Sequence, residues 1–174
     1  GLEFAWGIPA SVGGAAFMNA GAYGGEMSTV VDRVHALLPD GTPAVFHGEE
    51  LRYSYRHSAF MDNGGVITQV ICRLEHGNRD SIALLMEDYY TRRKENQPLN
   101  KPSAGSVFKR PEGHFAGALI EQCGLKGRRV GGAQVSEKHA GFIVNTGGAT
   151  CADVLALIRQ IQEEVYEKRG IRLE

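Results

Sequence analysis

The chain has 174 residues, 43% of them hydrophobic, and a formal net charge of −1 at pH 7. This length and composition allow a substantial hydrophobic core in one or two domains. The charge balance argues against a nucleic-acid or membrane surface, and no apolar run approaches the roughly 20 residues of a membrane span. The three cysteines are far apart and form no CxxC pair, so neither a disulfide framework nor a metal site is indicated. A reduced cytoplasm fits this cysteine usage best.

The first half of the chain is dominated by predicted strands. Residues 30–38 and 42–47 flank Pro39-Asp40-Gly41, a turn signal, and this arrangement predicts a hairpin. Residues 66–75 alternate with a period of two and carry β-branched residues on both faces, which predicts another strand. Residues 78–94 predict a helix whose basic last turn complements the helix dipole.

A domain boundary is predicted near residues 96–102. The sequence there is Gln97-Pro98-Leu99-Asn100-Lys101-Pro102, and its two prolines end any preceding helix. We therefore divide the chain into residues 1–97 and residues 98–174.

Beyond the boundary, helical and strand patterns alternate. Residues 115–123 predict a short helix ended by Gly124, residues 141–145 a strand, and residues 150–168 a helix ended by Gly170. The expected core consists of two strand residues and the apolar face of the last helix: Phe142, Val144, Val154, Ile158, Ile161 and Val165. Leu157 follows the same helical spacing. The whole chain is predicted to be α+β.

The most informative stretch is Pro-Ser-Ala-Gly-Ser-Val-Phe-Lys-Arg at residues 102–110. Gly105 has no side chain and lets backbone and ligand approach closely, and a hydroxyl at Ser106 can exchange a proton with a bound substrate. Ser and Gly are also common in ordinary turns that have no role in binding or catalysis. Taken alone, the motif favours a linker turn in which Ser106 is the first residue of a strand.

A second candidate is the glycine-rich segment Gly-Ile-Pro-Ala-Ser-Val-Gly-Gly at residues 7–14. Successive backbone N–H groups at a turn leading into a helix can hold an anion such as a phosphate. The segment is neither a Walker A loop nor a GxGxxG motif, so a mononucleotide or Rossmann site has no support. Taken alone, it favours a plain tight turn.

Several unusual strings occur in a fixed order along the chain. They are GLEFAWGIPASVGGA (1–15), NAGAYG (19–24), YSYRHS (53–58), the stretch at 102–110, and GGAQVSEKHAGFIVN (131–145). In order and spacing they resemble the UDP-N-acetylenolpyruvoylglucosamine reductases, also called UDP-N-acetylmuramate dehydrogenases. The resemblance spans essentially all 174 residues.

The resemblance implies a domain assignment. Residues 1–97 would be the C-terminal part of an FAD-binding α+β domain, and residues 98–174 a smaller α/β substrate-binding domain. Family members carry further residues upstream and a short C-terminal strand with a catalytic glutamate. The chain is therefore expected to be a fragment that binds FAD poorly by itself and shows no turnover, from a monomeric, cytoplasmic parent protein.

The resemblance also implies a reaction in bacterial peptidoglycan synthesis, and hence in cell-wall biogenesis, cell shape and cell division. FAD takes a hydride from NADPH and passes it to the methylene of UDP-N-acetylglucosamine enolpyruvate, which becomes UDP-N-acetylmuramate. Negative charge develops as an enolate on the conjugated carboxylate. A nearby cation would stabilise that charge, and an acid must protonate the carbon.

Two catalytic residues follow from the resemblance. Ser106 would donate the proton, and Arg56, in Tyr-Arg-His-Ser, would hold the enolpyruvyl carboxylate. A guanidinium offers a rigid fork of donors that matches a carboxylate. The alternative is that Arg56 is a surface arginine whose apolar stem lies over an aromatic neighbour, which is the commonest arrangement for such a residue.

Weaker assignments concern binding. The resemblance places Tyr55, Lys94 and Lys126 at the substrate, and His139 as a hydrogen-bonding group there, although solvated surface lysines are far more common. The flavin diphosphate would lie along Gly7, Ile8, Pro9, Ser11, Val12, Gly13 and Gly14. Tyr23 could stack on the flavin or fill the core. Arg110 replaces an asparagine of part of the family, so that contact is not carried over.

Two alternatives remain open. One is another flavin-dependent oxidoreductase of the same FAD-binding fold, such as an oxidase of alcohols or sugars, but these lack the strings Ser-Ala-Gly-Ser-x-Phe-Lys and Gly-Gly-Ala-Gln-Val-Ser. The other is a module that binds a nucleotide sugar without redox activity.

Overall fold

The computed structural model describes every residue of the chain, from Gly1 to Glu174. The chain divides into two compact units, Gly1–Arg92 and Arg93–Glu174, which we call the first and second unit. The division lies within helix α3 (Arg79–Asn96), whereas the sequence places it after residue 97. Both units contain helices and antiparallel sheet, which confirms the predicted α+β class. No helix combines the length and the apolar composition that a membrane span needs.

The predicted hairpin forms most of the main sheet of the first unit. This antiparallel sheet has the order β4-β3-β5, and its strands are Pro43–His47, Val31–Leu37 and Val66–Cys72. The hairpin turn closes as the sequence predicts, because Gly41 takes a φ of 82° and the Thr42 amide donates to Asp40 Oδ1 at 2.9 Å.

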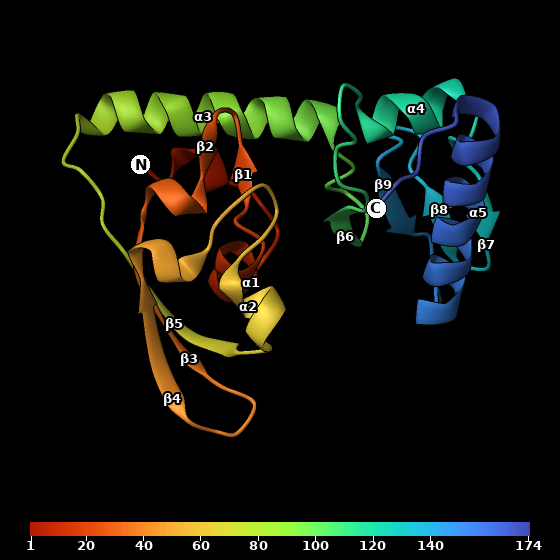
Figure 1. Cartoon of the computed structure of the whole chain (residues 1–174). Coiled ribbons are helices and arrows are strands. Elements are labelled where there is room, and N and C mark those ends of the chain that lie inside the picture. Colours follow the sequence, from red (N-terminus) through yellow and green to blue (C-terminus); the bar gives the residue numbers. More distant parts are fainter. The chain divides into compact units, whose positions relative to one another are not determined.

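Short elements complete the first unit. They are η1 (Glu3–Ala5), α1 (Val12–Phe17), β1 (Gly21–Ala22), β2 (Gly25–Glu26), η2 (Met27–Thr29), η3 (Gly48–Leu51) and α2 (Ala59–Asn63). Helix α1 packs against β5 and α2 (Figure 1). The hydrophobic core is split into two clusters, one around Phe4 and Met27 and the other around Val34 and Phe60.

Helix α3 confirms the helix predicted at 78–94 and continues to Asn96. Arg93 and Lys94 lie in its last turn. Within the first unit, the ring of Tyr89 stacks on that of Tyr23, with the ring centroids 4.6 Å apart. Tyr23 therefore packs against α3, and its predicted alternative, stacking on the flavin, stays a prediction.

The second unit is a four-stranded antiparallel sheet with two helices. The sheet has the order β6-β9-β8-β7, and its strands are Ser103–Ser106, Phe142–Asn145, Ala133–Val135 and Arg129–Val130. Helices α4 (Ala116–Gln122) and α5 (Cys151–Arg169) contact each other, and α5 also packs against β7 and β8 (Figure 1). The two predicted helices and the predicted strand of this half are confirmed.

Helix α5 begins and ends at the residues that the sequence signals. The Thr150 hydroxyl accepts a hydrogen bond from the Asp153 amide, and the Asp153 carboxylate accepts one from the Thr150 amide. This reciprocal cap satisfies two donors that the first turn leaves without partners. Gly170 ends the helix with a φ of 69°, a conformation that glycine adopts readily.

One hydrophobic cluster fills most of the second unit. Four residues that the sequence predicts as core are buried, namely Phe142, Val144, Ile161 and Val165, and Leu157, which follows the same helical spacing, is buried as well. Val154 and Ile158 are only half-buried and pack against the cluster, which corrects the expectation that they lie within it. The helical period explains the difference: the apolar residues of α5 span a wider arc of the helix surface than the rest of the unit covers, so those at the edge of the arc stay half-buried.

Candidate functional site

Ser106 is the last residue of β6, not the first residue of a strand as the linker alternative has it. It lies opposite Phe142 of β9, and the next amide, that of Val107, donates to the Gly141 carbonyl at 2.9 Å. Gly105 takes a φ of 101°, which a residue with a side chain rarely adopts. The glycine thus turns the strand end so that Ser106 is exposed beside β9.

His139 lies in the turn between β8 and β9. Its Nδ1 accepts a hydrogen bond from the Gly141 amide at 3.1 Å, and its ring meets that of Phe142 edge-on, with the centroids 5.0 Å apart. The turn is closed by the buried Ser136, whose Oγ accepts the amides of Lys138 at 3.1 Å and His139 at 3.3 Å. The imidazole is therefore held from its own backbone and from β9.

Glycines leave room for Ser106 and His139 to approach each other. A Cβ added to Gly141 would lie 3.3 Å from Ser106 Oγ and 3.2 Å from His139 Nδ1. Gly117 in α4 is similarly close, since a Cβ there would lie 3.0 Å from His139 Cε1. The serine hydroxyl and the imidazole thus both lie next to the Cα of Gly141, and a side chain at this position would crowd both groups.

Lys126 joins this group through its charge. Its Nζ lies 2.6 Å from Glu121 Oε1, and the lysine side chain is partly buried. Burial lowers the pKa of His139, and the Lys126 charge lowers it further, whereas a backbone hydrogen bond and the Glu121 charge act in the opposite direction. The second unit therefore brings together three of the predicted residues, Ser106, Lys126 and His139.

Lys94 is exposed near the end of α3. Its backbone carbonyl accepts a hydrogen bond from Lys138 Nζ at 2.6 Å, which ties the end of α3 to the turn that carries His139. The substrate contact predicted for the Lys94 side chain stays a prediction.

Arg56 lies in the first unit and is held by backbone carbonyls. Nη1 donates to Asn19 O at 3.2 Å, and Nη2 donates to Gly21 O at 2.7 Å. Its guanidinium carbon lies 5.1 Å from the centre of the Tyr55 ring, and Tyr55 is exposed. Its φ of 53° is unusual for a residue with a side chain, and such strain often marks functional positions.

Asn19 is a residue whose role the sequence did not reveal. It is fully buried and has a φ of 41°. Its side chain donates to Ser54 O at 3.0 Å and accepts the Ser28 amide at 2.8 Å, while its carbonyl accepts from Arg56. The signal was present in the Asn-Ala-Gly string, because asparagine tolerates the left-handed conformation better than most residues.

The glycine-rich segment 7–14 runs along the surface into α1. Ser11 caps this short helix by accepting the Gly14 amide at 3.0 Å. An apolar cavity of about 560 Å³ adjoins the segment, and it is lined by residues that include Ile8, Val12 and Met86. The predicted cofactor contacts along this segment stay predictions.

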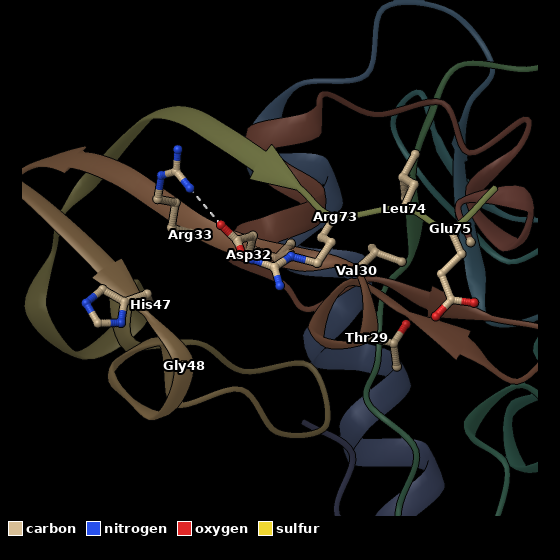
Figure 2. Close-up of a pocket in the computed structure, with 11 residues that line it drawn as sticks. Thr29, Val30, Asp32, Arg33, His47, Gly48, Arg73, Leu74 and Glu75 are labelled. Atoms are coloured by element: carbon tan, nitrogen blue, oxygen red, sulfur yellow. Dashed lines mark hydrogen bonds and ion pairs between the residues drawn. The ribbon is translucent and has the colours of Figure 1, made fainter.

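A larger cavity, of about 820 Å³, contains none of the predicted site residues (Figure 2). Asp32 lies in it and pairs with both Arg33 and Arg73, at 2.7 Å each. Both arginines therefore share one carboxylate, so this group of three charged side chains carries one positive charge in excess.

Comparisons with known proteins agree along the whole chain. The model of the UDP-N-acetylenolpyruvoylglucosamine reductase C-terminal domain matches residues 97–174. The chain is 55% identical over 174 residues to the UDP-N-acetylenolpyruvoylglucosamine reductase of Limosilactobacillus reuteri subsp. reuteri, of which it covers 58%. It is 52% identical to that of Latilactobacillus sakei subsp. sakei, of which it covers 57%.

A solved structure gives the same result. The crystal structure of UDP-N-acetylenolpyruvylglucosamine reductase from Thermus caldophilus is similar at a TM-score of 0.86 and 44% identity, over 100% of this chain and 62% of that one. The chain thus spans less than two thirds of the length of the relatives it matches. Residues 97–174 thus match the C-terminal domain of the UDP-N-acetylenolpyruvoylglucosamine reductase family, and the whole chain is similar to members of that family.

Proposed function

We propose that the protein to which this chain belongs reduces UDP-N-acetylglucosamine enolpyruvate to UDP-N-acetylmuramate, with FAD as the hydride carrier and NADPH as the reductant. We further propose that this protein is monomeric and cytoplasmic. The observation that carries the proposal is the grouping of Ser106, His139 and Lys126 in a chain that matches such reductases over its full length. These residues supply a hydroxyl, an imidazole and a cation to one small region.

The segment 7–14 fits FAD. The amides of Val12 and Gly13 lie in the first turn of α1, where no helical carbonyl is available to them, so they can donate to a phosphate. The adjoining cavity is lined mainly by apolar residues and suits a flat ring system. When bound, FAD would accept a hydride from the nicotinamide and deliver it to the enolpyruvyl methylene.

Arg56 would hold the carboxylate on which the enolate charge develops. Two of its N–H groups donate to Asn19 and Gly21 carbonyls, which fixes the plane of the guanidinium before any substrate arrives. A fixed cation stabilises developing charge more than ground-state charge, and removing one donor of this kind costs about 3 kcal/mol. Lysine would not replace it, because an ammonium lacks the rigid fork.

Ser106 would give the proton to the carbon next to the carboxylate. A serine hydroxyl is a weak acid, so it depends on neighbouring donors and on the basicity of the enolate. Lys126 would bind a phosphate oxygen of the nucleotide, for which it would have to leave Glu121. Lys94 and Tyr55 would line the substrate path.

Absorbance spectroscopy of the longer protein tests this proposal. NADPH should bleach the flavin band, and the enolpyruvyl nucleotide sugar should restore it in the absence of oxygen. An alcohol or sugar that bleaches the band would instead point to an oxidase of the same fold. Binding of the nucleotide sugar without any flavin signal would point to a binding module.

A further inference from the structure

We propose that His139 works as a neutral hydrogen-bond donor through Nε2–H, and that Ser136 is the positioning residue that holds it in this form beside Ser106. The tautomer follows from hydrogen bonds within this chain. The role of the donor toward substrate rests on the proposed function.

The tautomer follows from the partner of Nδ1. The Gly141 backbone amide lies 3.1 Å from Nδ1, and a backbone N–H can only donate. Nδ1 must therefore carry a lone pair, and the ring proton lies on Nε2.

Ser136 fixes the backbone that sets this geometry. It is 3% exposed, and its Oγ accepts the amides of both Lys138 and His139. The Ser136 amide in turn donates to the Phe142 carbonyl at 2.9 Å. The turn from Ser136 to Gly141 is thus pinned to β9, and the imidazole has little freedom to rotate away from the Gly141 amide.

The surroundings favour the neutral ring. The two charged side chains that act on His139 are Lys126, which disfavours a second positive charge, and Glu121 of α4, which is already paired with Lys126. The groups that face the ring from β6, β9 and α4 are uncharged: Ser106, Phe142 and Gly117. Together with burial, these contacts keep the pKa of His139 below its ordinary value.

A neutral His139 leaves the proton transfer to Ser106. An imidazolium next to the enolate would be a much stronger acid than serine and would compete for that step. A neutral ring instead offers one N–H to a negatively charged substrate oxygen without giving up the proton. In this arrangement Ser136 acts only through His139.

Long-range ¹⁵N–¹H NMR of the ¹⁵N-histidine-labelled chain tests the proposal without substrate or cofactor. The signals of His139 are identified by their loss in His139→Gln. We expect an unprotonated Nδ1 and a protonated Nε2 at pH 7, with a titration midpoint below the ordinary histidine value of 6.5. A protonated Nδ1 in the unaltered chain would overturn the proposal, whatever the variants do.

Two variants test the positioning residue. Ser136→Ala should raise the titration midpoint of His139 toward the ordinary histidine value of 6.5 and mix the tautomers, whereas Thr146→Ala should not. Thr146 is a matched control, because it also gives a hydroxyl hydrogen bond to backbone, at Gly132 O, in the same unit. Should Ser136→Ala not fold, Gly117→Ala keeps the Ser136 bonds but crowds the ring at Cε1 and should disturb the same signals.

Unchanged His139 signals in a folded Ser136→Ala chain would remove the positioning role of Ser136, and unchanged signals in Gly117→Ala would show that the ring is not held against α4. The flavin assay on the longer protein stays a separate test. A chain with the expected tautomer but a parent protein without reductase activity would refute the proposed function and leave the tautomer assignment standing.

Discussion

Arg56 in the first unit and the Ser106–His139 pair in the second unit are positioned by different means. The four non-glycine residues with positive φ, namely Asn19, Tyr23, Arg52 and Arg56, all lie in the first unit. In the second unit only glycines take such angles, and glycines also clear the space around Ser106 and His139. In the first unit, hydrogen bonds thus offset the backbone strain of the candidate site. In the second unit, glycines provide both the unusual backbone angles and the space around the candidate residues.

The two units also differ in how their hydrophobic cores are built. The second unit has one continuous cluster that includes α4, α5 and the sheet, whereas the first unit has two smaller clusters. Because burial of apolar area is the main stabilising contribution, we expect core changes to matter most in the second unit. In the first unit, we expect the buried hydrogen bonds around Asn19 to matter comparatively more.

The largest expected effect concerns chemistry in the second unit. In the longer protein, Ser106→Ala should slow reoxidation of the reduced flavin by the enolpyruvyl substrate by roughly 10²–10⁴-fold, because the enolate loses its acid. Flavin reduction by NADPH does not use that proton and should be nearly unchanged. Stopped-flow absorbance separates the two half-reactions, and Ser106→Cys should retain more activity than the alanine variant. Near-normal reoxidation by Ser106→Ala would show that the serine is only a turn residue.

The next effect is on the core of the second unit. Leu157→Ala should lower the free energy of unfolding by about 2–5 kcal/mol, since Leu157 is fully buried in the cluster. Ile158→Ala should lower it less, because Ile158 itself is only half-buried. Urea unfolding followed by hydrogen exchange of α5 peptides measures both variants. Equal losses would mean that α5 is rotated from the orientation described here.

A smaller loss is expected in the first unit. Asn19→Ala should reduce stability by about 1–3 kcal/mol, because the Ser28 amide and the Ser54 carbonyl lose a buried partner. Trp6, the only tryptophan, lies in this unit and reports its unfolding by fluorescence. Gln69→Ala removes an exposed amide side chain from the same unit and should change stability by less than about 0.5 kcal/mol.

A substitution at Tyr53, also in the first unit, is expected to preserve or raise stability instead of lowering it. Its hydroxyl is buried without a hydrogen-bond partner, and burial raises its pKa to about 12, with the Cys72 thiol adding to the shift. Tyr53→Phe should therefore leave the first unit as stable or stabilise it by about 1 kcal/mol. Because the unfolded tyrosine ionises near pH 10, the parent chain should lose stability between about pH 10 and 12. The phenylalanine variant should lose less stability in that range.

The smallest expected effect is a pH dependence in the second unit. Its folded state holds His139 with a lowered pKa, so the unfolded state binds more protons just below the ordinary value of 6.5. Stability should therefore be fully present above that value and fall as the pH drops toward the lowered one. Chemical denaturation between pH 7.5 and about 5 should show a shallower decline for His139→Gln. An identical decline would assign the effect to other groups.

Local signals in the sequence were sufficient for the regular elements. The Pro-Asp-Gly turn, the alternation at 66–75 and the helical spacing ended by Gly170 each act through neighbouring residues, so they predict the hairpin, β5 and α5, although β5 ends at Cys72. The short strands β1, β2, β6, β7 and β8 were not predicted. Strands of two to four residues carry too few side chains for a period to emerge, and their pairing depends on partners distant in the sequence.

By itself, the sequence determined the α+β class, the main helices and hairpin, and through its ordered motifs the family and the candidate residues. Only the tertiary structure decided which candidates meet: it brings Ser106, Lys126 and His139 together and surrounds Arg56 with the carbonyls of Asn19 and Gly21. The structure also shows that Leu157 is fully buried in the core whereas Ile158 is not. It further shows that Asn19 and Ser136 hold the backbone near the candidate residues by hydrogen bonds. The physical reason is that periodicity and capping are local, whereas burial and the partner of a polar group are set by segments far apart in the chain.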